Sequence, residues 1–198
     1  MTVPKTLLQL AGADLSLPKL SDACLVLIDL QNEYLAGPIA LPDADAAIAN
    51  AARLLARARR SGAAIFHVAH KGRPGGLFDR TAERGAIVAP LAPLGGEPLV
   101  EKELPNAFAG TALQARIAAT GRKNIILAGL MTHMCISSTA RAALDLGFRV
   151  TIDATSCATR DLPDGRVGSV AAATVHDVAL VELSDRFAII ARDGDALA

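Results

Sequence analysis

Three residues with complementary chemistry follow three separate apolar runs of this sequence. Asp29 ends the first run, Lys102 ends a later one, and Cys135 follows a third, just before a helix-like segment. A carboxylate can take the proton of a thiol, an ammonium can orient that carboxylate, and a thiolate can attack a carbonyl carbon. If the fold brings them together, these residue types predict nucleophilic catalysis. Separately, they would be a loop-capping aspartate, a solvated lysine and a buried structural cysteine.

Cys135 is the most informative of the three. We expect it in the first turn of a helix that directly follows a strand. Helix N-termini carry partial positive charge and unpaired N–H groups, which favour a thiolate and lower its pKa below the free value of about 8.5. The same N–H groups can stabilise an oxyanion on an attacked carbonyl.

Apolar runs alternate with helix-like segments along the chain. Strands are expected over residues 24–29, 63–69, 98–102, 124–130, 148–153 and 179–183. Helices are expected over residues 43–61, 111–119, 135–146 and 166–177, while 187–191 is either a short strand or a tail. This alternation predicts a single α/β domain over residues 1–198, a three-layer, Rossmann-like, six-stranded parallel sheet with helices on both faces.

The predicted sheet brings the three residues to one edge. In open α/β sheets, ligands bind outside the carboxyl ends of the strands, near the point where the strand order reverses. Asp29, Lys102 and Cys135 all follow such ends and are expected to converge there. The irregular stretch over residues 71–97 is long enough to be a binding loop or lid.

Composition excludes several other functions. Twenty Lys and Arg balance twenty Asp and Glu, and aromatic residues make up 3% of the chain, so no nucleic-acid partner is expected. No apolar run approaches the roughly 20 residues of a membrane span. No glycine-rich phosphate loop follows Asp29, so we expect no nucleotide cofactor. Residues 1–10 lack a signal-peptide pattern, and three widely spaced cysteines suit a reducing cytoplasm.

These motifs, in this order and spacing, resemble the isochorismatase-like superfamily of cysteine hydrolases over residues 23–187. The matching segments are Leu27–Asn32, Lys102, Asn106–Phe108 with Thr111, Gly129–Cys135, Ser138–Ala142 and Asp153–Ala158. The resemblance implies a thioester on Cys135, with Asp29 as general acid and base and Lys102 orienting it. It also implies a cis peptide between Leu130 and Met131, with an oxyanion hole from the N–H groups of Met131 and Cys135.

Two differences from better-known members of the family limit the expected substrate. Nicotinamidases of the family carry an Asp-x-His metal pair after the second strand, whereas this sequence has His67 and His70, three residues apart. Such a pair points to opposite faces of a strand, so no metal is expected. True isochorismatases of the family lack the nucleophilic cysteine. The missing Asp-x-His pair therefore argues against nicotinamide and the presence of Cys135 against isochorismate, so a small carboxamide or ureido compound is the expected substrate.

The walls of the pocket are expected from residues next to the three strand ends. Gln31, Tyr34, Phe108, Thr132 and His133 are the candidates for substrate contact, although a core position is the ordinary alternative for Phe108.

The sequence contains two further cysteines, which matter for a second possible function, redox sensing. Cys24 is expected in the core and Cys157 in a structural role. The alternative is a non-enzymatic ligand-binding or redox-sensing protein that oxidises Cys135, for example to a disulfide with Cys157. The resemblance also implies a homo-oligomer, a dimer or larger.

Overall fold

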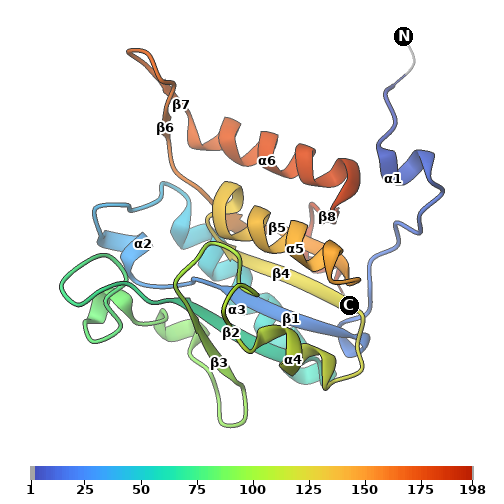
Figure 1. The fold of residues 1–198 in the computed structure, drawn as a ribbon, viewed down its shortest axis with the longest axis horizontal. Helices are drawn as coiled ribbons and strands as arrows, with labels where there is room; N and C mark the ends of the chain where they lie inside the picture. Colours follow the sequence, from blue (N-terminus) through green and yellow to red (C-terminus); the bar gives the residue numbers. More distant parts are fainter. Residues whose placement is uncertain (1–2, 198) are drawn as a thin grey trace.

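A parallel sheet of six strands forms the centre of the protein, which a computed structural model describes over residues 3–197 (Figure 1). The strands are β1 (Ala23–Ile28), β2 (Ala64–His70), β3 (Leu99–Lys102), β4 (Asn124–Leu130), β5 (Arg149–Ala158) and β8 (Ile189–Ala191). Their order is β3-β2-β1-β4-β5-β8, and every neighbouring pair is parallel. The predicted fold class, a six-stranded parallel α/β sheet, is confirmed.

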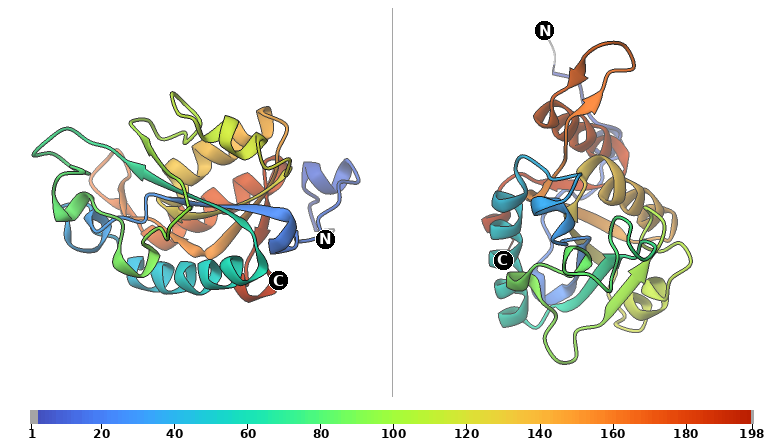
Figure 2. Two further views of the ribbon diagram at one scale, coloured as in Figure 1. Left: turned by 90° about the horizontal axis from the view of Figure 1, so that it is seen from below. Right: turned by 90° about the vertical axis from the view of Figure 1, so that its left-hand side faces the viewer.

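Helices cover both faces of the sheet (Figure 2). The long helix α3 (Ala44–Ser61) lies on one face, and α4 (Leu113–Ala118), α5 (Ser137–Asp145) and α6 (Ala172–Arg186) lie on the other. Strand β1 is buried along its whole length, and its alternate residues pack against the two helix layers in turn. This explains its continuous apolar sequence, because a strand covered on both faces has no solvent side.

Shorter elements complete the chain. They are α1 (Leu7–Leu10), α2 (Glu33–Ala36), the π-helical turn η4 (Thr132–Ile136) and a small hairpin of β6 (Leu162–Pro163) and β7 (Ser169–Val170). Single 3₁₀ turns lie at residues 20–22, 83–85, 89–91 and 194–196. The hairpin projects beyond the sheet and helix layers (Figure 1).

The strand predicted over residues 179–183 is wrong, since this segment belongs to α6. Ala179, Leu180 and Leu183 are buried, a spacing of one and then three residues that a helix face produces and a strand does not. A short apolar run does not distinguish the two by itself. The edge strand is β8, and the helix expected from residue 166 begins at Ala172 because the hairpin occupies the preceding residues.

The strand order reverses at the centre of the sheet. From β1 the chain builds outward through β2 and β3, whereas β4, β5 and β8 build outward on the other side of β1. The chain therefore diverges after β1 and β4, leaving the crevice in which α/β folds bind ligands. Asp29 follows β1 and Cys135 follows β4, so both lie at this reversal.

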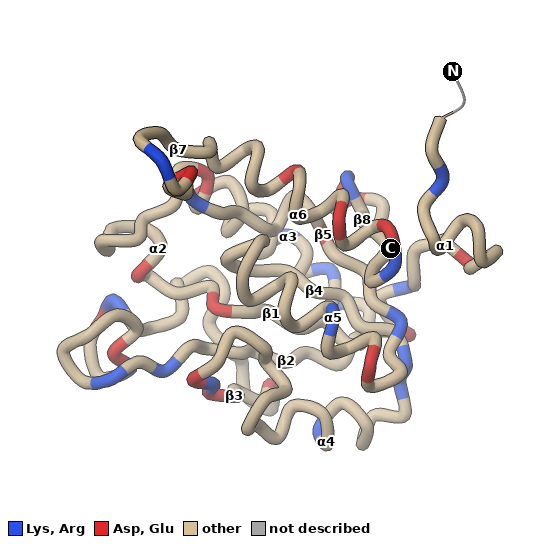
Figure 3. Tube along the Cα trace, turned by 45° about the horizontal axis from the view of Figure 1, so that its top comes forward, with Lys and Arg blue, Asp and Glu red and all other residues tan. Residues whose placement is uncertain are grey.

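Charges of both signs are interspersed along the trace (Figure 3). This distribution agrees with a formal net charge of zero. Within residues 3–197, no helix is both long and apolar enough to span a bilayer.

Candidate active site

The three sequence-predicted residues meet in the interior. Nζ of Lys102 lies 2.6 Å from Oδ2 of Asp29 and donates to Sγ of Cys135 at 3.3 Å. Asp29 is 0% exposed, Lys102 1% and Cys135 5%. Ordinary solvation is therefore lost to all three groups, and each depends on the other two for its electrostatic environment. We call these residues the trio.

Sheet register explains how Lys102 reaches Asp29. Lys102 is the last residue of β3, and its Cα partner in the neighbouring strand is His70, the last residue of β2. Asp29 follows β1, the strand beyond β2, and its N–H donates to the carbonyl of Val68. Neighbouring strands lie about 4.8 Å apart, so a short side chain could not cross β2, whereas lysine can.

Local backbone geometry aims the carboxylate. Asp29 has φ of +53°, a left-handed conformation that aspartate tolerates better than most residues. Residues held in this region concentrate at functional sites.

Cys135 lies in η4, the turn that joins β4 to α5. The peptide between Leu130 and Met131 is cis, as the sequence resemblance implied. The carbonyl of Met131 accepts from the N–H groups of Met134 and Ile136, which closes the turn around Cys135. Single π-helical turns of this kind are frequent at functional sites.

Burial dominates the electrostatics of the trio. It raises the pKa of the Asp29 carboxyl above its usual value, although the Lys102 ammonium and the Cys135 thiol oppose the change. It also raises the pKa of the Cys135 thiol to about 12, with the Asp29 charge adding to the rise and Lys102 opposing it. The expectation of a lowered thiol pKa is therefore wrong, because desolvation and a neighbouring carboxylate outweigh the helix terminus.

His70 is a fourth polar residue of the site that sequence reasoning considered only as a metal ligand. Its Nδ1 lies 3.3 Å from Nζ of Lys102. Burial, followed by the Lys102 charge, lowers the pKa of the imidazole. His70 ends β2, which lies between the strands that carry Asp29 and Lys102. A polar residue at that strand end is the sequence feature that could have predicted its place in the site.

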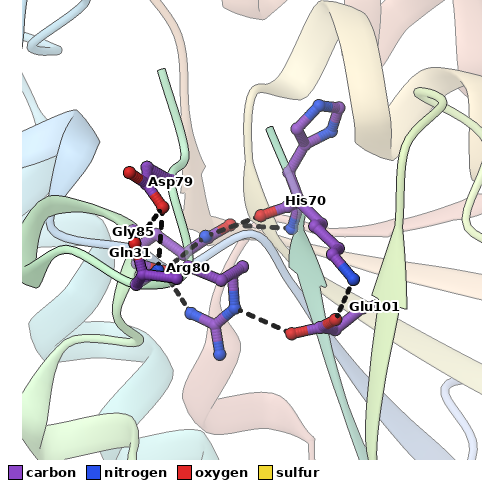
Figure 4. Close-up of polar contacts among 8 residues, drawn as sticks. Gln31, His70, Asp79, Arg80, Gly85 and Glu101 are labelled. Carbon is purple, nitrogen blue, oxygen red and sulfur yellow. Dashed lines mark hydrogen bonds and ion pairs between the residues drawn. The ribbon is translucent and has the colours of Figure 1, made fainter. Parts of the chain in front are cut away.

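Gln31 lies beside the site with its amide fully used by the protein (Figure 4). Its Oε1 accepts from the N–H of His70 at 2.8 Å, and its Nε2 donates to the carbonyls of His70 at 3.0 Å and Gly85 at 2.8 Å. The side chain is 0% exposed. Gln31 was predicted to contact substrate, but its amide hydrogen-bonds the backbone of His70 and Gly85 and so forms a clamp that holds the end of β2 in place.

Salt bridges attach the loop that follows β2 to the edge strand β3. Glu101 in β3 pairs with Lys71 at 3.3 Å and with Arg80 at 3.2 Å (Figure 4). Arg80 also donates to the carbonyl of Gly85, which Gln31 holds from its other side. The loop after β2 is therefore tied to both β1 and β3.

The remaining predicted pocket residues differ in their distance from the trio. Tyr34 is buried, packs edge-on against Phe78, and has a pKa raised by burial and then by the charges of Asp29 and Cys135. Its phenol therefore lies within the electrostatic reach of the site. The ring of Phe108 instead stacks on Phe148, which precedes β5 at its amino end, away from the edge that holds the trio.

Thr132 and His133 tether η4 to later elements. The Thr132 hydroxyl hydrogen-bonds Nδ1 of His176 in α6 at 2.8 Å. His133 hydrogen-bonds the Thr159 hydroxyl and lines a groove of about 430 Å³ against the hairpin and α6. Both polar groups are thus engaged with the protein on the α6 side of Cys135.

Arg160 was missed by sequence reasoning. Its Nε is buried without a hydrogen-bond partner among residues 3–197. Its Nη1 donates to the carbonyl of Asp161 at 3.3 Å, and its positive charge opposes the rise in the pKa of Tyr34 and lowers the pKa of His133. An arginine following strand β5 carries no motif of its own, and only the folded chain brings its charge to bear on Tyr34 and His133.

His67 serves a structural cluster away from the trio. Its Nε2 lies 2.8 Å from Glu97, which Arg59 also binds through Nε and a terminal nitrogen at 2.8 Å each. Across the part of the chain that the structure describes, no group of three or more His, Cys, Asp or Glu residues is placed to hold a metal ion. Cys24, Cys135 and Cys157 are free thiols, all buried.

Comparison with known proteins identifies the family. Residues 23–193 match the model of the isochorismatase domain. A solved isochorismatase from Pseudomonas putida KT2440 is 42% identical, covers 99% of this chain and 100% of its own, and superposes with a TM-score of 0.95. A secreted isochorismatase effector of Verticillium dahliae is 35% identical over 93% of this chain and 95% of its own. A maleamate amidohydrolase of Pseudomonas putida is 31% identical over 65% of this chain and 68% of its own.

The chain belongs to the isochorismatase family and is a hydrolase of that family.

Proposed function

We propose that this hydrolase cleaves the C–N bond of a small carboxamide or ureido compound through a thioester on Cys135. The observation that carries the proposal is the contact of one ammonium, that of Lys102, with both the Asp29 carboxylate and the Cys135 sulfur. A thiol, a base of raised pKa and a fixed cation in one buried site are the parts that acyl transfer needs. The maleamate amidohydrolase among the relatives supports an amide substrate.

The first half of the reaction moves one proton through Asp29. The Cys135 thiol gives its proton to the carboxylate as sulfur attacks the carbonyl carbon, and the carbonyl oxygen becomes an oxyanion. The N–H groups of Met131 and Cys135 would stabilise that oxyanion. Asp29 then returns the proton to the leaving nitrogen, which departs as ammonia or an amine and leaves a thioester.

The second half repeats the cycle with water. Asp29 takes a proton from the attacking water, and the thioester collapses to a carboxylic acid. The proton on Asp29 goes back to the Cys135 sulfur, which restores the starting state. Lys102 keeps its proton throughout and stabilises whichever of the two groups carries the negative charge. No metal or organic cofactor enters this scheme.

Two features of the site favour a substrate with an anionic substituent. Arg160 has a buried Nε without a partner in the described chain, and its charge reaches Tyr34. A carboxylate would satisfy the guanidinium, because arginine forms forked hydrogen bonds with carboxylates. We therefore place carboxylate-bearing amides ahead of neutral ones.

Ammonia release tests the activity. The panel contains maleamate, N-carbamoyl amino acids, ureido acids and neutral carboxamides, and isochorismate is followed separately by pyruvate release, because hydrolysis of its vinyl ether frees no ammonia. Wild type with and without chelator runs beside Cys135→Ala. We expect chelator-insensitive turnover of an anionic amide by wild type and none by the variant. Turnover of isochorismate alone, or equal rates for Cys135→Ala, would refute the thioester mechanism.

The redox-sensor alternative has less support. Burial raises the pKa of both Cys135 and Cys157, and thiols that sense peroxide need thiolate character and exposure. The three unpaired thiols still suit a reducing compartment, and we propose a cytoplasmic location on that basis.

We also propose that the chain is a single domain that assembles into a homo-oligomer. Four of the five exposed valines among residues 3–197 lie on α6 and on the hairpin, at Val167, Val170, Val178 and Val181. Apolar side chains grouped on one surface mark association sites. Light scattering should give at least a dimer for wild type and a smaller species for Val181→Glu. Monomeric wild type would overturn this assignment.

A further inference from the structure

The ammonium of Lys102 has three N–H donors and three neighbouring acceptors. The first two are the Asp29 carboxylate and the Cys135 sulfur, at 2.6 Å and 3.3 Å. The third is Nδ1 of His70, at 3.3 Å. Lysine has donors only, so Nδ1 must be the acceptor and the neutral imidazole carries its proton on Nε2. The ammonium thus forms an ion pair with the carboxylate and hydrogen bonds with the sulfur and the imidazole, and a rotation would cost it one of these contacts.

The site keeps His70 in the state that accepts. Lys102, Asp29 and Glu103 are the charged groups that act on the imidazole, and Lys102 has the largest effect of the three. A second proton on the ring would face the ammonium across 3.3 Å with no lone pair to offer. Burial and the Lys102 charge both lower the pKa of His70, which keeps the ring neutral near pH 7.

The backbone of His70 is fixed as firmly as its ring. The Gln31 amide binds both the N–H and the C=O of His70, and Gln31 is itself anchored on the Gly85 carbonyl (Figure 4). The imidazole packs on the ring of Phe78, with centroids 5.0 Å apart. His70 is also the Cα partner of Lys102 in the sheet. Three separate elements therefore determine where Nδ1 points.

We propose that His70 is a positioning residue that holds the Lys102 ammonium between the Asp29 carboxylate and the Cys135 sulfur through a hydrogen bond to Nδ1. The role rests on the proposed function, because it orients the cation of that same thiol reaction. The Gln31 clamp, which the sequence suggested as a substrate contact, supports His70 instead. His70 does not exchange a proton with the substrate.

Loss of the acceptor has a defined consequence. One buried donor of Lys102 would be unsatisfied, which makes the ammonium less stable and its contact with the sulfur looser. The Cys135 thiolate would then form less readily, while substrate recognition would be unaffected. The reaction should slow through kcat at constant KM.

Two substitutions separate the hydrogen bond from the packing of the ring. His70→Asn places an amide oxygen near the position of Nδ1, keeps the acceptor and removes the ring. His70→Leu fills the space beside Phe78 but has no acceptor and excludes a replacing water. Thermal unfolding of both variants verifies that they are folded before any rate is compared.

The rate of Cys135 alkylation by iodoacetamide at pH 8, followed by intact mass, is the readout that needs no substrate. Hydrogen bonds to charged groups correspond to about 10- to 100-fold in rate. We expect a loss of that size for His70→Leu, in alkylation and in kcat, and less than about 3-fold for His70→Asn. Equal losses in the two variants, or a wild-type rate for His70→Leu, would overturn the proposal.

The outcomes keep the two proposals apart. If wild type hydrolyses no amide, the proposed function fails while the alkylation rates still decide the role of His70. If amides are hydrolysed and His70→Leu reacts as fast as wild type, only the positioning role fails. A change in KM without a change in kcat would also overturn it, because it would place His70 in substrate binding.

Discussion

Removing one charge of the Asp29–Lys102 pair should damage stability and activity, while removing both should damage activity alone. The two side chains are fully buried, with 2.6 Å between Nζ and Oδ2, so Coulomb's law gives about 6 kcal/mol at an effective dielectric constant of 20. Breaking such a pair typically costs 3–5 kcal/mol, because the remaining charge is buried without a partner. We expect that loss for Asp29→Asn and for Lys102→Met.

The double variant Asp29→Asn/Lys102→Met is the matched control. It buries no charge, so its free energy of unfolding should return to within about 1–2 kcal/mol of wild type. Its activity should not return, since loss of a general base alone costs about 10²- to 10⁴-fold. Urea unfolding and ammonia release measure the two properties separately. If the loss of stability in the double variant equals the sum of the single losses, the pair is not coupled and the reasoning is wrong.

Three further substitutions test how the site is supported. Glu97→Gln should lose about 3 kcal/mol at pH 7, since Arg59 holds the Glu97 pKa at about 2 rather than 4.5. That stability is present above pH 4.5 and lost as the pH falls toward 2, so the gap between wild type and variant in urea unfolding must shrink at pH 3. Gln31→Leu should cost about 2–4 kcal/mol, because three hydrogen bonds to backbone vanish inside the protein; an unchanged urea midpoint would contradict the clamp. Gly129→Ala should cost more than about 4 kcal/mol and yield insoluble protein, since φ is +141° and its Cβ would lie 2.0 Å from the Ile28 carbonyl oxygen; soluble, active Gly129→Ala would show that β1 and β4 can separate.

The position of the trio could be predicted because it depends on local signals. Continuous apolar runs mark strands buried on both faces, and a polar residue that ends such a run lies at the edge of the sheet. Asp29 follows this rule directly, whereas Lys102 ends the short edge strand β3, in which exposed and buried residues alternate. Parallel strands place their carboxyl ends at one edge, so three separate local patterns were enough to predict that the trio would meet.

Other features depend on contacts between distant segments. The segment 179–183 reads equally well as strand or helix, and only the packing of one α6 face on the core separates the two. His70 acquires its role because the sheet order puts β2 between β1 and β3, which no local pattern encodes. The charge of Arg160 acts on Tyr34 only because the chain is folded. Sequence patterns thus predict elements better than they predict which elements become neighbours.

The thiol pKa illustrates the same limit and also explains the chemistry. A helix terminus acts locally and predicts a reactive thiolate, but burial and Asp29 raise the Cys135 pKa to about 12. The resting site is therefore a neutral thiol beside a carboxylate and an ammonium, with a net charge of zero. Moving the proton from sulfur to Asp29 leaves that sum at zero, and the raised pKa of Asp29 makes the transfer less unfavourable. An external base would instead leave a thiolate and a carboxylate buried with one ammonium, a net negative charge that the interior resists. A buried thiol can thus hold its proton at rest and still become a nucleophile when an electrophilic carbon enters the site, because the proton never has to leave the trio.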